Sequence, residues 1–248
     1  MSETETPRVV VIGAGVAGLT AGTFTARAGF DTIVLSGGES ILSRNAHLEN
    51  VPGFPAGVDA RLFADLLAEQ TERNGARIER GTVTGLDAGN PFTLELDGGP
   101  SELRADYVIV ASWPDASYLG SVPGVGLLDR GSKTYVDVDE RGRTGVEGLY
   151  AAGRIAEKPH QTVVCAGHGA EVAIALIEDS EIPFYHDWVV PEGYFTDRGR
   201  EIPPGCEEID EAERKRRERE SIARMQDAFE GPHPGEPTTH PGIEDGSG

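Results

Sequence analysis

The chain has 248 residues, a formal net charge of −20 and a sequence pI near 4.6. So acidic a surface repels nucleic acid and anionic lipid, so neither is an expected partner. No apolar run reaches the roughly 18–20 residues that span a bilayer. The polar, acidic start over residues 1–7 does not have the pattern of a signal peptide. We therefore expect a soluble, cytoplasmic protein.

The lysines and cysteines give further information about the kind of soluble protein that this is. The three lysines are Lys133, Lys158 and Lys215, and strong acidity with scarce lysine is typical of a halophile's cytosolic protein. An acidic mesophilic protein from a GC-rich genome is the alternative. Cys165 and Cys206 lie far apart, and no Cys-x-x-Cys occurs. We therefore expect neither a zinc ribbon nor a local dithiol, and the histidines show no metal-ligand spacing.

The first 35 residues predict a βαβ unit. Residues 8–12 form an apolar, β-branched run typical of a strand buried on both faces. A Gly-rich turn follows over residues 13–18. Residues 19–28 then predict a helix, which ends at Gly29, and residues 31–35 predict a second buried strand.

The next part of the chain keeps alternating strands and helices. Helices are predicted over residues 60–74 and 164–177. Strands of a small antiparallel sheet are predicted over 76–87 and 92–96, with a turn over 97–100 leading to 101–103. Further strands are predicted over 106–111, 135–138 and 148–152. We therefore expect an α/β fold, a Rossmann-like doubly wound parallel sheet in three layers with a small antiparallel β insertion.

The composition changes after residue 180. Residues 182–204 are rich in Pro, Gly and aromatic residues without a clear period, and residues 209–229 predict a charged helix. We expect a nucleotide-binding domain over residues 1–180, a C-terminal extension with the charged helix over 181–230, and a disordered tail over 231–248.

The glycine turn predicts dinucleotide binding. Gly13 permits the tight turn, Gly15 lets the backbone approach a pyrophosphate, and Gly18 lets the helix pack close to the strand. The helix start then offers free N–H groups and a positive dipole end. The alternative is a glycine-rich turn that binds nothing. Ser36 stands where an acid usually holds the ribose, which disfavours a simple NAD dehydrogenase.

Several further segments together resemble the thioredoxin reductase-like flavoproteins. Ser-Gly-Gly-Glu over residues 36–39 and Glu-Asn-Val-Pro-Gly-Phe over 49–54 resemble that family's FAD loop. Asp-Tyr-Val-Ile-Val-Ala over 106–111 resembles its central strand. Gly-Leu-Tyr-Ala-Ala-Gly-Arg over 148–154, with Gln161 and the Ala-Gly-His-Gly over 166–169, resembles its second FAD motif. The resemblance covers residues 7–178 and identifies residues 1–180 as an FAD-binding domain.

This resemblance implies FAD as the cofactor and assigns roles by position. The pyrophosphate would contact Gly13, Gly15, Val16, Ala17 and Gly18. The adenosine end would contact Ser36, Gly37, Gly38, Glu39 and, through its backbone, Val83. The flavin and ribityl end would contact Asn50, Ala111, Gly153, Gln161 and Thr162. The last two would stand at a helix N-terminus, whose dipole stabilises negative charge on the ring.

The chain also departs from this family pattern. The interval 112–146 is too short for the family's NAD(P)H domain, and the redox Cys-x-x-Cys is absent. Ser112 and Trp113 replace Thr-Gly, and Arg154 replaces an Asp that accepts hydrogen bonds from the ribityl chain. Since a guanidinium accepts none, Arg154 would pair with a flavin phosphate, or the site would be degenerate and empty.

Four features have two interpretations each. Cys165 is either a buried small residue, which we favour, or a thiol activated by a helix N-terminus. His168 is a packing or surface residue rather than a base, and His160 is either a surface residue or a contact of the flavin edge. The aromatic residues over 184–195 either pack on the sheet edge or a dimer partner, which we favour, or cover the flavin as a lid.

The function expected is that of an FAD-dependent oxidoreductase without dithiol chemistry. No catalytic residue and no metal ligand is assigned. Because no donor domain is encoded in the interval 112–146, electrons would come from a separate donor, either a small redox protein or a diffusing nicotinamide. The alternative is a non-catalytic FAD-binding or regulatory module with a degenerate active site. A third, minor alternative is an NAD-binding protein. The family resemblance implies a homodimer.

Overall fold

A computed structural model describes residues 6–98 and 101–239. Its central sheet is parallel, with the strand order β10-β7-β1-β2-β3. The strands are β1 (Arg8–Ile12), β2 (Asp31–Ser36), β3 (Arg77–Arg80), β7 (Tyr107–Val110) and β10 (Leu149–Ala151). Most of their residues are apolar, and many of these are Val or Ile, which suits strands that are covered on both faces.

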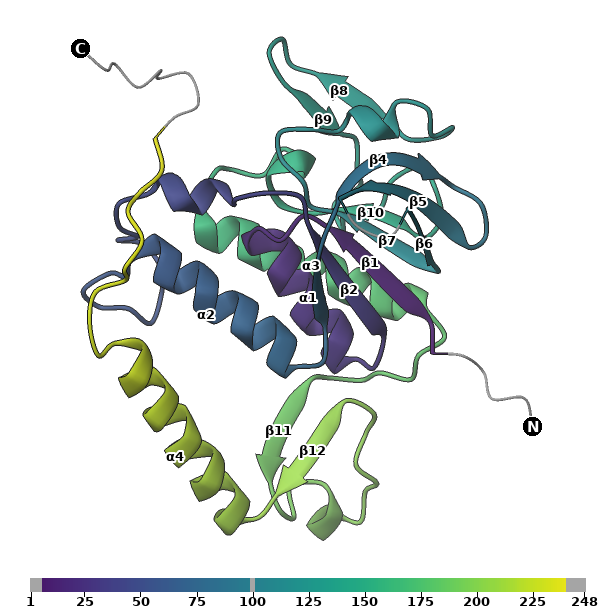
Figure 1. Cartoon of the computed structure of the whole chain (residues 1–248). Helices are drawn as coiled ribbons and strands as arrows, with labels where there is room; N and C mark the ends of the chain where they lie inside the picture. The colour runs from purple at the N-terminus through teal and green to yellow at the C-terminus, as the bar shows by residue number, and fades with distance from the viewer. Residues whose placement is uncertain (1–5, 99–100, 240–248) are drawn as a thin grey trace, which may run out of the picture.

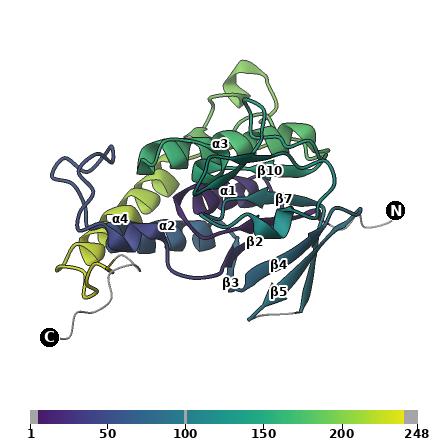
Figure 2. The same cartoon turned by 90° about the horizontal axis from the view of Figure 1, so that it is seen from above.

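The sheet is the middle layer of three (Figure 2). One outer layer contains the helices α1 (Val16–Arg27), α2 (Ala60–Arg73) and α3 (Thr162–Asp179). The other outer layer contains the antiparallel strands β4 (Thr82–Asp87), β5 (Phe92–Asp97) and β6 (Glu102–Ala105). The predicted fold class, a doubly wound parallel sheet with a small antiparallel insertion, is confirmed.

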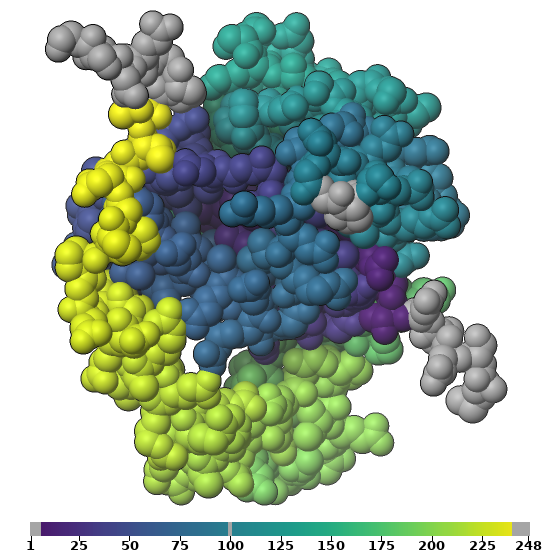
Figure 3. Space-filling view, viewed as in Figure 1, coloured from purple at the N-terminus to yellow at the C-terminus, as the bar shows by residue number. Residues whose placement is uncertain are grey.

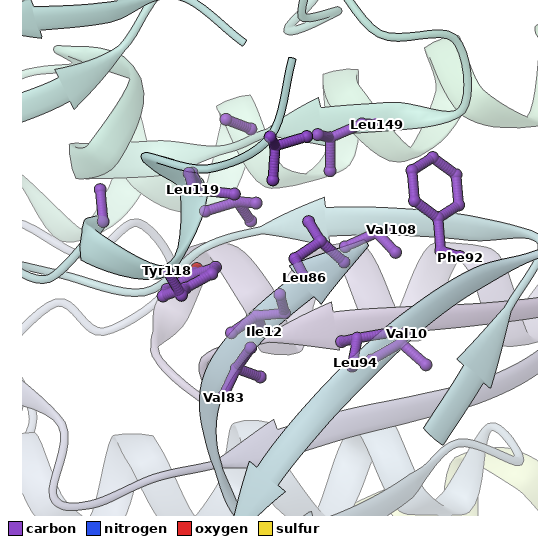
Figure 4. Packing of buried hydrophobic residues seen from close by; sticks show 14 of the residues in the cluster. Val10, Ile12, Val83, Leu86, Phe92, Leu94, Val108, Tyr118, Leu119 and Leu149 are labelled. Atoms are coloured by element: carbon purple, nitrogen blue, oxygen red, sulfur yellow. The ribbon is translucent and has the colours of Figure 1, made fainter. Parts of the chain in front are cut away.

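Alternate residues of β1 belong to two different cores, as the two-residue period of a strand requires. Val10 and Ile12 pack in the core shared with the antiparallel layer, where Leu94 is fully buried (Figure 4). Val9 and Val11 pack with the helices in the second core. All four side chains are at most 4% exposed, so β1 anchors both layers.

The structure differs from the predicted strands in two places. Residues 76–87 were expected in the antiparallel sheet, but β3 extends the parallel sheet by pairing with β2, and only β4 is antiparallel. The apolar pattern does not show that the chain changes sheet at Gly81. The interval before β10 also contains a hairpin of β8 (Leu127–Asp129) and β9 (Thr134–Val136), of which only the second strand was predicted. The predicted turn over 97–100 lies partly outside the described residues.

A C-terminal arm follows α3. It begins with two parallel strands, β11 (Trp188–Pro191) and β12 (Cys206–Ile209). The first lies within residues 182–204, the segment for which no secondary structure was predicted, and the second lies just after it. The predicted charged helix is confirmed as α4 (Glu211–Ala228), none of whose residues is buried. Arg224 binds Glu69 of α2 at 2.6 Å, and α4 lies along one side of the molecule (Figures 1 and 3).

The chain beyond α4 returns to the body. The Thr238 N–H donates to the Ser43 carbonyl at 2.9 Å, on the 3₁₀ helix η1 (Ile41–Arg44). This contact belongs to the tail that was predicted to be disordered; its residues 240–248 lie outside the described residues. The division at residues 180 and 230 stays a prediction. Within 6–98 and 101–239, no helix is long and apolar enough to cross a membrane.

Helices α1 and α3 approach each other so closely that one crossing point requires glycine. A Cβ on Gly169 of α3 would lie 2.2 Å from the Ala17 carbonyl oxygen of α1, which is backbone and cannot move aside. Two residues earlier on the same helix, Gly167 is exposed and a Cβ there would meet nothing within 4 Å.

Gly169→Ala should therefore lower the free energy of unfolding by about 2–3 kcal/mol through overpacking. Gly167→Ala should leave it unchanged or raise it by up to about 1 kcal/mol, because alanine favours the helix. Denaturant unfolding of the two variants measures the difference. Equal effects would contradict the close crossing.

Candidate dinucleotide site

A cavity of about 430 Å³ opens at the carboxyl end of the sheet, where α1 and α3 begin. Gly15 and Gln161 are the N-cap residues of these helices, and both line the cavity. Neither N-cap side chain makes a capping hydrogen bond, and neither first turn contains an acid. Free N–H groups and the positive ends of two helix dipoles therefore meet at one cavity, a combination that attracts an anionic ligand.

The three glycines of the turn are needed for different reasons. Gly13 has a φ of +112°, and a Cβ on it would lie 2.8 Å from the Ala111 carbonyl oxygen. A Cβ on Gly18 would lie 1.9 Å from the Gly13 carbonyl oxygen. The fold therefore needs both of these glycines. At Gly15 the backbone is extended and a Cβ would meet only the Ser40 Oγ, at 4.0 Å, so a side chain there would enter the cavity.

Two residues predicted to contact the flavin are joined across the cavity. The Asn50 Nδ2 donates to the Gln161 Oε1 at 2.7 Å, which links the loop after η1 to the start of α3. Leu42 and Leu48 anchor this loop, since both are about 5% exposed. The loop thus forms a fixed wall of the cavity opposite α3.

Gly153 and His168 form the back of the site. Gly153 has a φ of +76°, and its N–H donates to the His168 Nδ1 at 2.9 Å. The imidazole therefore carries its proton on Nε2, which is buried and has no partner among the described residues. Burial, with a smaller effect of the Lys158 charge, lowers the pKa of His168 to about 4. His168 is thus a buried backbone acceptor, which agrees with the packing interpretation.

Cys165 and His160, for which the sequence left two interpretations each, lie on the cavity wall. Cys165 is 9% exposed, and its Sγ lies 3.5 Å from the Pro159 carbonyl oxygen. Burial raises the pKa of this thiol, so it stays protonated at neutral pH, as expected of a buried small residue rather than an activated nucleophile. His160 lines the cavity from an exposed position.

Trp113 and Arg154, which depart from the family pattern, contact each other and the Tyr135 ring. The rings of Trp113 and Tyr135 lie 5.1 Å apart at an angle of 28°. The Arg154 Cζ lies 5.1 Å from the Trp113 ring centre and 5.4 Å from that of Tyr135. Arg154 also donates to the Lys158 carbonyl at 3.1 Å. The guanidinium is therefore held in place, and both Trp113 and Arg154 line the cavity.

Half of the predicted site residues line the cavity directly. They are Gly15, Val16, Ala17, Asn50, Ala111, Arg154, Gln161 and Thr162. Three more form the backbone frame beside it, namely Gly13, Gly18 and Gly153. The residues predicted at the adenosine end are outside the cavity wall. Ser36, Gly37, Gly38 and Glu39 end or follow β2, and the Val83 side chain is buried in the core.

Sequence reasoning missed the other lining residues of the loop before Asn50. They are Ser40, Ile41, Leu42, Asn45, His47, Leu48 and Glu49. Their proximity to Asn50 in the sequence was the available signal. The alternative of an aromatic lid is wrong, because Asp187 binds Arg27 at the C-terminal end of α1. A 12-residue helix separates that end from Gly15 by roughly 18 Å.

Comparisons with known proteins agree with this geometry. The profile of the pyridine nucleotide-disulphide oxidoreductase family matches residues 7–127 and 48–169. The chain belongs to this family. Thioredoxin reductase of Dictyostelium discoideum is a relative, 33% identical over 135 residues, which are 50% of this chain and 41% of the relative. Thioredoxin reductase of Aquifex aeolicus is 38% identical over 108 residues, 42% of this chain and 33% of the relative.

Solved structures of the family share the fold. A thioredoxin reductase from Gloeobacter violaceus aligns with a TM-score of 0.62 at 18% identity, over 74% of this chain and 100% of that one. The atypical thioredoxin reductase of Desulfovibrio vulgaris Hildenborough aligns with a TM-score of 0.58 at 20% identity, over 72% and 100%. The matched part of the chain spans between one third and about two fifths of the length of the first curated relatives of the family.

The buried imidazole predicts a pH dependence of stability. The pKa of His168 is about 4 in the folded chain, below its ordinary value of 6.5. Between these values the unfolded chain binds more protons, so stability falls as the pH falls. We expect His168 to cost about 2 kcal/mol of unfolding free energy between pH 7 and pH 5.

His168→Asn is the control for this prediction. Its amide oxygen can still accept from the Gly153 N–H, but it does not titrate. Denaturant unfolding at both pH values should show a smaller drop for the variant than for the wild type. An equal drop would assign the pH dependence to other groups.

Proposed function

We propose that the chain binds FAD and acts as an FAD-dependent oxidoreductase that receives electrons from a separate donor. The main support is the meeting of two uncapped helix N-termini at one cavity. FAD presents a diphosphate and an electron-accepting ring, and the positive end of a helix stabilises negative charge on either of them. Membership of a flavin-dependent family supports the same cofactor.

The residues of the cavity fit this cofactor in three ways. The free N–H groups after Gly15 would bind the diphosphate, which the lack of a side chain there admits. The start of α3, with Gln161 fixed by Asn50, would face the polar edge of the ring. Ala111, between them on the cavity wall, is small enough to leave the ring room. When bound, the isoalloxazine supplies the electron transfer, and the protein orients it and sets its electrostatics.

The proposed chemistry does not involve a dithiol. The chain contains only Cys165 and Cys206, which are far apart in sequence, and both are free. The interval where an NAD(P)H domain would be inserted instead holds the β8–β9 hairpin. We therefore propose a separate donor, either a small redox protein or a diffusing nicotinamide. On the separate ground of the family resemblance, we propose a homodimer, in the cytoplasm, as the working assembly.

A non-catalytic FAD-binding or regulatory module is the second candidate. The raised pKa of the Cys165 thiol favours it, because no activated nucleophile then faces the cavity. Both candidates require FAD to bind, and they differ in whether the bound cofactor is reduced and reoxidised.

FAD binding is tested with Gly15→Asp. The aspartate would supply the missing capping side chain and stabilise α1 by roughly a few tenths of a kcal/mol, while its charge enters the cavity at the place proposed for the diphosphate. We expect a higher melting temperature together with at least a tenfold loss of FAD affinity, measured by flavin absorbance in high salt.

Gly231→Asp is the matched control, because it adds the same charge at an exposed glycine beyond α4, where a Cβ would meet nothing within 4 Å and which is not on the cavity wall. It should retain both stability and affinity. A wild-type protein that takes up no FAD would contradict both candidate functions.

Turnover separates the two candidates. Anaerobic stopped-flow mixing of the FAD-loaded protein with NADH, NADPH or reduced ferredoxin should bleach the flavin absorbance for at least one donor. Reoxidation by an added acceptor should then restore it. A cofactor that binds tightly but is reduced by none of the three donors would favour the regulatory module.

A further inference from the structure

Two cations and two aromatic rings gather beside the cavity, and two members of this group, Trp113 and Arg154, line the cavity wall. We call Trp113, Lys133, Tyr135 and Arg154 the Trp113–Arg154 cluster. Besides the contacts of Arg154 described above, the Lys133 Nζ lies 5.3 Å from the Trp113 ring centre. The members come from three separate segments, namely the chain after β7, the β8–β9 hairpin and the 3₁₀ helix η3 (Gly153–Ala156). The fold thus assembles this cluster from segments that are distant in sequence.

Among the described residues, the two cations of the cluster have no carboxylate partner within ion-pair distance. Most arginines in the described ranges bind a carboxylate, as expected in a chain with a net charge of −20, but Arg154 and Lys133 bind none there. The acid next in sequence to this region, Glu157, is bound by Arg130 at 2.8 Å. The hydrogen bond from Arg130 and, to a smaller extent, the charge of Arg154 lower the pKa of Glu157. No carboxylate among the described residues contacts the Arg154 guanidinium itself, so its N–H groups are available to an anionic ligand.

The strand order places the cluster relative to the proposed cofactor. Trp113 follows β7 and Arg154 follows β10, whereas the glycine turn follows β1 and Ser36 ends β2. The cluster therefore lies beyond the turn, on the side away from Ser36. A dinucleotide with its diphosphate at the turn and its adenosine near Ser36 would present its reactive ring to the cluster. A second reactant must meet that ring.

We propose that the Trp113–Arg154 cluster binds a small organic carboxylate, which is the second reactant of the flavin site. This rests on the proposed function for the role of the ligand, but not for its binding. The planar guanidinium of Arg154, fixed by the rings and by the Lys158 carbonyl, matches a carboxylate through two parallel hydrogen bonds. Lys133 adds a second positive charge, and the Trp113 indole offers an apolar surface for the body of the ligand.

The test uses benzoate as the probe and benzamide as its neutral analogue. Because the chain has two tryptophans, Trp188→Phe makes Trp113 the only indole, and its fluorescence reports binding to the cofactor-free protein. We expect a saturable change with benzoate at constant ionic strength and a much weaker one with benzamide. With FAD bound, benzoate should perturb the visible flavin bands without displacing the cofactor.

Arg154→Met in the same background should weaken benzoate binding to the cofactor-free protein about tenfold, the effect of losing a charge-assisted pair. Arg200→Met is the control, because Arg200 is exposed on the arm and forms no ion pair among the described residues. It should bind benzoate like the wild type. If Arg154→Met fails to fold, Lys133→Met in the exposed hairpin turn should show a smaller loss in the same direction.

Several results would overturn this proposal. Equal affinity for benzoate and benzamide would show that charge is not recognised. Benzoate affinity unchanged in both Arg154→Met and Lys133→Met would exclude the cluster. Parallel loss of FAD in Arg154→Met, with inorganic phosphate displacing FAD from the wild type, would assign the guanidinium to the cofactor's diphosphate. A protein that binds benzoate but not FAD would contradict the proposed function alone.

Discussion

The whole site depends on the contact between the start of α1 and the third turn of α3. Ala17 is the residue where they meet: its carbonyl faces Gly169, and its Cβ lies where a side chain of Gly153 would begin. This contact requires glycine at two positions of the second half of the domain. As a result, the N-termini of two helices that begin about 145 residues apart in sequence face the same cavity.

The electrostatics of the cavity follow from that packing. A single helix start offers a diffuse partial charge, whereas two starts joined by the Asn50–Gln161 hydrogen bond surround a ligand from two sides. His168 supports the same arrangement from behind, because it occupies the Gly153 N–H that would otherwise be buried without a partner. Burial keeps this imidazole neutral, so it adds no charge to the site.

The fold class and the frame of the site could be predicted because they are local. The apolar run before Gly13, the glycine spacing and the helix after it carry their own signals in consecutive residues, and Gly153 repeats the pattern after β10. The change of sheet at Gly81 could not be predicted, because both strands around it have the same kind of side chains and differ only in their partners.

The chemical departures show the same limit. The sequence shows that Arg154 and Trp113 differ from the family pattern, but not that they stack on each other and on Tyr135. That contact depends on the β8–β9 hairpin, whose first strand has only three residues and no periodic signal. Likewise, the tail composition predicts disorder, whereas its contact with Ser43 depends on a partner nearly 200 residues away.

The hydrogen bond from Thr238 to Ser43 has a mechanical consequence. Together with the ion pairs between α4 and α2, this hydrogen bond holds the C-terminal arm and tail against α2 and connects them to η1. The helix η1 is the first part of the cavity wall. Helix α4 buries none of its residues, and it is held by these ion pairs and by the contact of Phe229 with Phe54, whose ring centres lie 6.2 Å apart. We therefore expect this segment to open at a lower free energy than the core. Because salt weakens exposed ion pairs, we expect ionic strength to change how firmly this C-terminal segment is held against η1 beside the cavity.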